Sequence, residues 1–421
     1  MGNQLKKSMN RFYHETKTPR GNFWEKSAGS IASLLAVLND GASEAKNFAA
    51  TPITAGVDGS NCPLLAAERK DVSAYMKQFL STAEEVFVGR SSDFSTIAYC
   101  DLTHNYISLS AKHLNLLAVY AASIMQFQRL AEASQSETSP DSTLLTARSE
   151  FDAVLADYVE GNLDQSRGSA FVKETYGEYS MSHLRLTSKA ESWMIAHEYG
   201  HLIARKDKKR LLEASDPFMA SLFEVPLLQQ EYLSWGEEWR EEFRCDALAC
   251  LYLLREADPS TLREDTLFHL MSALQAPIVA LSCAETLIRQ PGLEEEDDTH
   301  PSSISRIVLL VFSIVRRCGT LYARRSLDTV GGRLLMPTLF FFSASLLEYV
   351  LWMLGEKAAT GMHFPGVQGM SVGETTEFRY KHTYEFLVEL SLGDIAEDAM
   401  EYGMYWLSLG KATASTPSGS S

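Results

Sequence analysis

The sequence predicts a mainly α-helical fold with a small β-sheet, an α+β arrangement. Two observations carry this prediction. From residue 190 onward, apolar residues recur at helical spacing almost without interruption. Between residues 86 and 110, by contrast, short runs of β-branched and aromatic residues alternate with turn residues. We therefore expect two or three strands in that segment, with helices around and after them.

The residues before the sheet are expected to form an N-terminal helical region, 1–85. Its first 22 residues are polar and basic and are typical of a flexible or peripheral arm. They also lack the apolar stretch of a secretory signal peptide. Apolar residues at helical spacing then predict helices at 24–38 and 64–82.

The residues after the sheet are expected to be helical, with a few interruptions. Helices are predicted at 111–130 and 144–160, whereas 171–186 is typical of a strand pair or irregular coil. Small, polar and proline-containing stretches predict loops at 214–226, 291–303, 328–333 and 359–373. We expect a core over 86–310, a C-terminal helical region over 311–410 and a disordered tail over 411–421.

Charge and cysteine usage narrow the function. The 421 residues carry a formal net charge of −16 and a sequence pI of about 5.1. A nucleic-acid backbone would be repelled by such a chain, so we expect no nucleic-acid partner. The 6 cysteines show no Cys-x-x-Cys spacing and lie mostly in apolar surroundings. They are expected to be buried free thiols, which indicates a reducing, cytoplasmic setting.

Two apolar stretches could be mistaken for membrane spans. Residues 304–315 are too few to cross a bilayer. Residues 334–354 are long enough, but they include Pro337 and Glu348, and a carboxylate inside a span is unusual. We expect both stretches to be buried helices. A membrane-associated protein that uses 334–354 remains the alternative.

The strongest chemical signal is His197-Glu198-Tyr199-Gly200-His201, within a predicted helix. Residues four apart lie on one helix face, so both imidazoles can bind a single zinc ion. Glu198 lies at the edge of that face, where it can act as a general base on a metal-activated water. The other interpretation is a pair of packed histidines with a surface glutamate.

A later helix is expected to supply the third zinc ligand. In the segment 239–249, Glu242 and Asp246 are four residues apart and therefore share one side of the helix. Glu242 is the candidate ligand, with Glu238 and Glu241 as rivals. Asp246 precedes an apolar run, so it is expected to be buried and to accept a hydrogen bond from a zinc-binding histidine.

A third segment, Thr299-His300-Pro301 followed by Arg306, joins an acidic loop to a helix. His300 is a candidate catalytic residue that could donate to the oxyanion of a tetrahedral intermediate. Arg306 could pair with an acid near the metal. The alternative is an ordinary helix-entry loop with an exposed histidine.

Taken together, these motifs resemble the gluzincin clan of zinc metallopeptidases. The Thr-His-Pro…Arg segment further resembles the HtpX-like and CAAX-prenyl-protease-like branch, and residues 105–110 resemble the strand before its active-site helix. The phage-exclusion proteases such as Lit are a looser analogy. The resemblance covers about residues 100–310. It implies a zincin-like core, ligands His197, His201 and Glu242, a base at Glu198 and a supporting Asp246.

The expected function is therefore zinc-dependent endopeptidase activity on a protein or peptide substrate. A strand at 106–109 or within 176–184 is expected to hold the substrate backbone. The loop 214–226 is expected to cover the cleft. A non-catalytic, zinc-stabilised binding protein would use the same ligands and is the alternative from a different class.

Overall fold

A computed structural model describes part of the chain, and every structural statement below concerns that part. It comprises residues 3–16, 71–80, 86–91, 98–110, 116–126, 149–156, 180–255, 266–288, 301, 303–323, 339 and 346. The predicted helix at 24–38, the predicted loops at 328–333 and 359–373 and the predicted tail lie outside it.

Three short strands form one sheet, which confirms the sequence prediction for 86–110. The strands are β1 (Phe87–Ser91), β2 (Ala98–Asp101) and β3 (Tyr106–Ser110). Their order is β1-β3-β2, with β1 parallel and β2 antiparallel to β3. Both edges of the central strand are thus already paired. The prediction that residues 106–109 hold a substrate strand is therefore wrong.

Helix α1 (Asn3–Glu15) packs on the sheet, which corrects the expectation of a flexible or peripheral arm. Its Phe12 is fully buried against Phe87 and Tyr106, with ring centroids 5.2 and 5.5 Å apart. The Tyr106 hydroxyl donates to Glu15 at 2.6 Å. The arm was expected because the segment is polar and basic, yet its few apolar side chains lie on one helix face.

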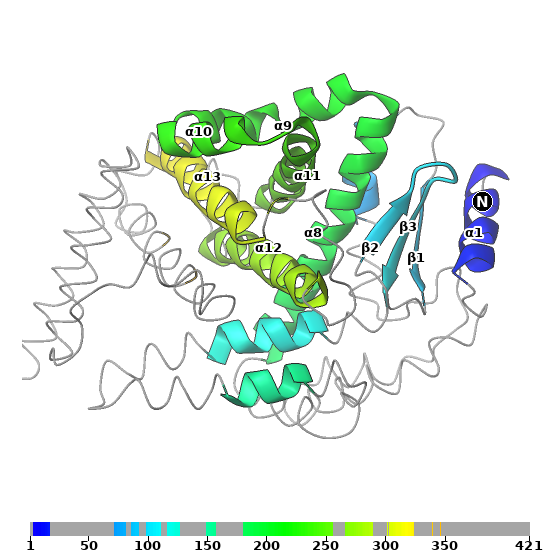
Figure 1. Ribbon diagram of the computed structural model, residues 1–421, viewed down its shortest axis with the longest axis horizontal. Helices are drawn as coiled ribbons and strands as arrows, with labels where there is room; N and C mark the ends of the chain where they lie inside the picture. The colour runs from blue at the N-terminus through cyan, green and yellow to red at the C-terminus, as the bar shows by residue number, and fades with distance from the viewer. Residues whose placement is uncertain are drawn as a thin grey trace, which may run out of the picture.

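Six helices make up most of the described chain (Figure 1). They are α8 (Ser180–Lys206), α9 (Lys208–Phe223), α10 (Pro226–Ser234), α11 (Glu237–Leu254), α12 (Thr266–Ile288) and α13 (Ser303–Ala323). Shorter helical stretches at 71–76, 116–126 and 149–156 lie within three predicted helices. The described structure is thus mostly helical with a small sheet, as the sequence predicts.

Helix α8 is the centre of this arrangement. The sheet lies between α1 and α8, with β2 next to α8, and α11 and α12 pack on α8 as well (Figure 1). Almost every side chain from Leu186 to Gly200 is buried. A helix that is buried all round needs no amphipathic stripe, because packing rather than an apolar face stabilises it. The side chains of this stretch of α8 therefore face the protein interior.

Two expectations about the chain around α8 are wrong. Residues 180–186, taken as the end of a strand pair or coil, are the first turns of α8, so no strand spans 176–184. Residues 171–179 lie outside the described ranges. Polar residues in this segment weaken its helical pattern in the sequence. The helix is stabilised by the burial of Leu186 and Ala190.

The expected loop at 214–226 is also mostly helix, because only Glu224 and Val225 separate α9 from α10. Pro217 suggested a break, since an internal proline costs a helix about 3 kcal/mol. Here Leu211, Phe218 and Leu222 are fully buried on the same helix, and their packing offsets that cost. The segment is therefore helical and is not the loop that was expected over the cleft.

No helix in the described ranges is long and apolar enough to cross a membrane. The stretch 304–315 belongs to α13, and its side chains pack in the same hydrophobic core as those of α8. The stretch 334–354 lies outside the described residues except for Leu339 and Leu346, which are buried.

Replacing Phe12 by alanine tests the docking of α1. The loss of a fully buried ring should cost about 3–5 kcal/mol and free α1 from the sheet. Hydrogen exchange of the α1 amides should become much faster. Lys7→Ala, at an exposed position of the same helix, should leave the exchange unchanged. Equal protection of α1 in both variants would mean that the helix does not depend on this contact.

Candidate metal centre

Helix α8 presents His197 and His201 on the face that packs against α11. The two rings lie 4.8 Å apart between centroids, and their Nε2 atoms are 3.1 Å apart. Trp193 stacks on His197 at 5.5 Å, and its indole N–H donates to the Cys250 thiol on α11 at 3.3 Å. The His197 ring is therefore held from one side by a tryptophan that is itself bonded to the neighbouring helix.

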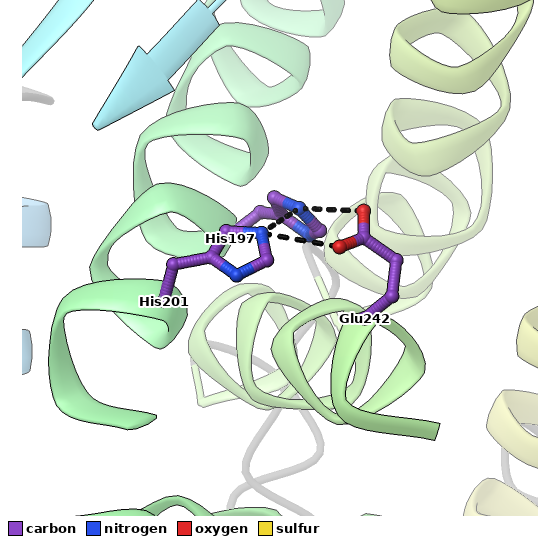
Figure 2. A group of neighbouring side chains, drawn as sticks. All are labelled: His197, His201 and Glu242. Atoms are coloured by element: carbon purple, nitrogen blue, oxygen red, sulfur yellow. Dashed lines mark hydrogen bonds and ion pairs between the residues drawn. The ribbon is translucent and has the colours of Figure 1, made fainter. Parts of the chain in front are cut away.

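Helix α11 brings the carboxylate of Glu242 to both imidazoles (Figure 2). Its Oε1 lies 3.1 Å from Nε2 of His197, and its Oε2 lies 3.2 Å from Nε2 of His201. The rival acids lie elsewhere: Glu238 is exposed, and Glu241 pairs with Lys208 at 3.4 Å. The convergence that the sequence hypothesis requires is thus present, with Glu242 as its carboxylate.

The donor atoms of this group suit a zinc ion. Two imidazole nitrogens and one carboxylate are a donor set used by catalytic zinc sites. Bonds of about 2.0–2.1 Å in a tetrahedron place neighbouring donor atoms about 3.3–3.4 Å apart. The separations observed between the Nε2 atoms and the Glu242 oxygens are 3.1–3.2 Å. Only small movements would separate this arrangement from a ligand set.

The opposite nitrogen of His197 contacts Asp246, which is fully buried on α11. Nδ1 of His197 lies 2.8 Å from Oδ1 of Asp246. Arg306 on α13 donates to both Asp246 oxygens at 2.6 and 2.8 Å, and its Nη2 lies 3.2 Å from Oε1 of Glu242. The guanidinium of Arg306 therefore orients both Glu242, the candidate ligand, and Asp246, the acid that contacts His197. Sequence reasoning placed both residues in these supporting positions.

Buried charge strongly perturbs the ionisation of this group. Burial lowers the pKa of His197, but the carboxylates of Glu242 and Asp246 outweigh that effect and raise it to about 10. Burial raises the pKa of Glu242, but His197 and Arg306 hold it well below its usual range. At neutral pH, His197 is therefore an imidazolium between two carboxylates.

Glu198, the candidate base, is 9% exposed and follows His197 directly on α8. Its carboxylate lies near Cys100 on β2, the strand beside α8. Burial, followed by the adjacent Glu198 charge, raises the pKa of the Cys100 thiol above its ordinary range. Glu198 thus lies on the side of α8 that faces β2.

Gly200 allows α8 and α11 to approach closely at the centre. A β-carbon added there would lie 2.8 Å from both Cβ and Sγ of Cys245 and 3.0 Å from its Cα. Real side chains do not approach backbone atoms of another helix that closely, so only glycine fits at this crossing. The same Cys245 sulfur lies 3.7 Å from Nδ1 of His201. The spacing between the two helices, and hence between the histidines and Glu242, depends on Gly200.

Sequence reasoning missed the cysteines that border this centre. All 6 were expected to be buried free thiols, and the 5 within the described ranges are free. Four of those are buried, whereas Cys100 is half-buried. Cys245 could have been singled out, because it lies between Glu242 and Asp246 on α11, three residues after the candidate ligand. His300 lies outside the described residues, although Pro301, which follows it, is buried.

A second group of potential ligands, Glu15, Asp101 and His104, lies where α1 meets the turn after β2. Its members already have partners. Asp101 accepts from the backbone and the ring of His104, and Glu15 accepts from Tyr106 and pairs with Arg11. Its side chains are 20–33% exposed, whereas those of His197 and Glu242 are 9% and 6% exposed. This group is explained as a set of contacts that dock α1 on the sheet.

No protein-family model, no curated protein and no solved structure matches this chain. The interpretation of the centre therefore depends on its own geometry.

Replacing Gly200 by alanine should separate the two helices. We expect a loss of about 1–3 kcal/mol of stability from overpacking, together with weaker zinc binding. Thermal unfolding and zinc titration against a competing chelator measure the two effects. The control is Gly236→Ala, because no atom lies within 4 Å of a β-carbon added at Gly236. Normal zinc affinity in Gly200→Ala would show that the crossing does not set the ligand spacing.

Zinc binding should depend on pH through His197. With a pKa of about 10 this histidine holds an extra proton at neutral pH, and a metal must displace it. The apparent zinc affinity should therefore rise about tenfold per pH unit from about pH 7 to about pH 9. Asp246→Asn removes one cause of the raised pKa, so it should flatten this slope. An affinity independent of pH in the unaltered protein would contradict the assignment.

Proposed function

We propose that this chain is a zinc-dependent endopeptidase of the zincin-like type. The observation that carries the proposal is the convergence of His197, His201 and Glu242 at 3.1–3.2 Å, with Glu198 beside them on α8. Two histidines and a glutamate are typical ligands of catalytic zinc, whereas purely structural zinc sites use mostly cysteine. The donor set thus favours an enzyme.

When bound, zinc supplies Lewis acidity, which polarises a peptide carbonyl and lowers the pKa of water to about 7. The side chains of this chain supply the rest. His197, His201 and Glu242 hold the ion, while Asp246 and Arg306 keep His197 and Glu242 oriented. Holding one ligand nitrogen by a carboxylate on the other side is the usual way to fix an imidazole in its binding orientation.

Glu198 is the proposed general base. Its carboxylate removes a proton from the attacking water and later returns that proton to the leaving amine nitrogen. Its position supports this role, since it is next to a ligand histidine in the sequence but is not among the converging ligand atoms. His300 remains a proposed donor to the oxyanion, on the strength of the sequence motif alone.

Strand β2 is the proposed docking strand for the substrate backbone. It lies beside α8, and only its edge toward β3 is paired among the described residues. An extended peptide can add to such an edge through main-chain hydrogen bonds. The half-buried Cys100 of this strand lies near Glu198, so a peptide docked along β2 would pass close to the proposed base.

The resemblance to gluzincins agrees with this arrangement. A third ligand on a later helix, and an acid one turn further along, are the features on which the resemblance depends. Here Glu242 and Asp246 occupy those positions on α11, and Arg306 of the Thr-His-Pro…Arg segment contacts both. The proposed family is thus supported by the contacts of three residues that are far from the His-Glu-x-x-His motif in sequence.

Glu198→Gln tests the proposed function. The amide keeps the size of the side chain but cannot accept the proton, so cleavage of a peptide library should fall by about 10²-fold or more. Zinc content should stay at one ion per chain, since Glu198 is not a ligand. Glu238→Gln, on the exposed part of α11, is the matched control and should cleave normally.

Other outcomes of that experiment have a clear meaning. Unchanged cleavage in Glu198→Gln would remove the proposed role of Glu198. Bound zinc without cleavage by the unaltered protein would favour a zinc-stabilised binding protein, in which the metal joins α8 to α11 and has no catalytic role.

A further inference from the structure

The two candidate histidine ligands have different partners at Nδ1, the ring nitrogen that points away from Glu242. Nδ1 of His197 faces the carboxylate of Asp246 at 2.8 Å, whereas Nδ1 of His201 faces the thiol of Cys245 at 3.7 Å. A carboxylate only accepts hydrogen bonds, but a thiol can either donate or accept. The two ligands are thus supported by chemically different groups.

This difference matters because Nε2 of His201 can either donate to Glu242 or bind a metal ion. Its Nε2 lies 3.2 Å from Oε2 of Glu242, which can only accept, and 3.1 Å from Nε2 of His197. The Nε2–H of His197 has its own acceptor, Oε1 of Glu242 at 3.1 Å, so each imidazole donates to one carboxylate oxygen and Nε2 of His201 carries the hydrogen. A neutral imidazole has one donor and one acceptor nitrogen, so Nδ1 then accepts. If Nε2 binds a metal instead, Nδ1 must carry the hydrogen and donate. The partner of Nδ1 must therefore suit both tautomers.

We propose that Cys245 is a positioning residue for His201, with a thiol that donates to Nδ1 before metal binding and accepts from Nδ1–H afterwards. The proton leaves Nε2 and is replaced on Nδ1 by one from water, so the charge of His201 does not change. An acid in place of Cys245 would allow only the second state. The inference rests on the proposed metal centre, but it does not require peptidase activity.

The packing around Cys245 holds the sulfur in this position. Cys245 is fully buried, and its Cβ and Sγ would both lie 2.8 Å from a β-carbon on Gly200. Its helical neighbours in the centre, Glu242 three residues before it and Asp246 directly after it, contact His197. One turn of α11 therefore carries three groups that together contact both histidines. A larger acceptor at 245 would collide with α8.

The tautomer of His201 can be measured directly on the full-length protein with ¹⁵N-labelled histidine. Long-range ¹H–¹⁵N spectra distinguish a protonated ring nitrogen from a bare one, and the His201 signals are those lost in His201→Gln. We expect hydrogen on Nε2 in chelator-treated protein and on Nδ1 after addition of zinc. Hydrogen on Nδ1 in both samples would overturn the proposal, and this measurement needs no variant at position 245.

Variants of Cys245 give the second measurement, the affinity for zinc in competition with a chelator. Cys245→Ala removes the partner of Nδ1 and should weaken zinc binding about tenfold, the effect expected for lost support of a ligand. Cys245→Ser keeps a group that can donate and accept, so it should recover most of that loss. Cys283→Ala, which removes a buried thiol from α12, is the control and should bind zinc normally.

Equal zinc affinity in Cys245→Ala and Cys283→Ala would also overturn the proposal. These readouts are independent of peptide cleavage. A tautomer change with no hydrolysis by any form of the protein would keep the role of Cys245 and remove the peptidase. Hydrolysis without a tautomer change would keep the peptidase and remove the role of Cys245.

Discussion

The close crossing of α8 and α11 is the constraint on which the centre depends. Each helix alone carries an incomplete site: α8 has two imidazoles, and α11 has the carboxylate that contacts both of them. They meet because Gly200 lets the backbone of α8 lie against Cys245. Buried side chains above and below the crossing hold the two helices together. The donor atoms are thereby placed by packing, which is stiffer than a loop.

A second constraint is electrostatic. Asp246 and Glu242 are buried carboxylates, and burial without partners would be costly. Arg306 contacts both acids from α13, so the third helix is joined to the other two by charge as well as by apolar packing. The centre is therefore part of what holds α8, α11 and α13 together. Arg306 and Asp246 are 60 residues apart in the sequence and meet only in the folded chain.

Interactions between residues close together in the sequence could be predicted, whereas contacts between distant segments could not. The spacing of His197 and His201 and that of Glu242 and Asp246 are local, so helical periodicity placed each pair on one face. The docking of α1 depends on Phe87 and Tyr106, far along the chain, and local polarity concealed it. Pro217 suggested a break that buried neighbours overcome. Cys245 was overlooked because its contact with His201 depends on the approach of a second helix.

The buried ionisable groups also define a charge that the interior must balance. Around the candidate centre, Glu198, Glu242 and Asp246 contribute three formal negative charges and Arg306 one positive charge. The imidazolium of His197 offsets one of the remaining two. A divalent cation that displaced the His197 proton would leave these groups neutral as a set, whereas a monovalent ion would leave one negative charge. The charges of these residues thus favour a divalent ion over a monovalent one. Because Glu198 lies on α8 and Glu242 and Asp246 lie on α11, an ion bound there would also offset the repulsion among these acids when the two helices pack together.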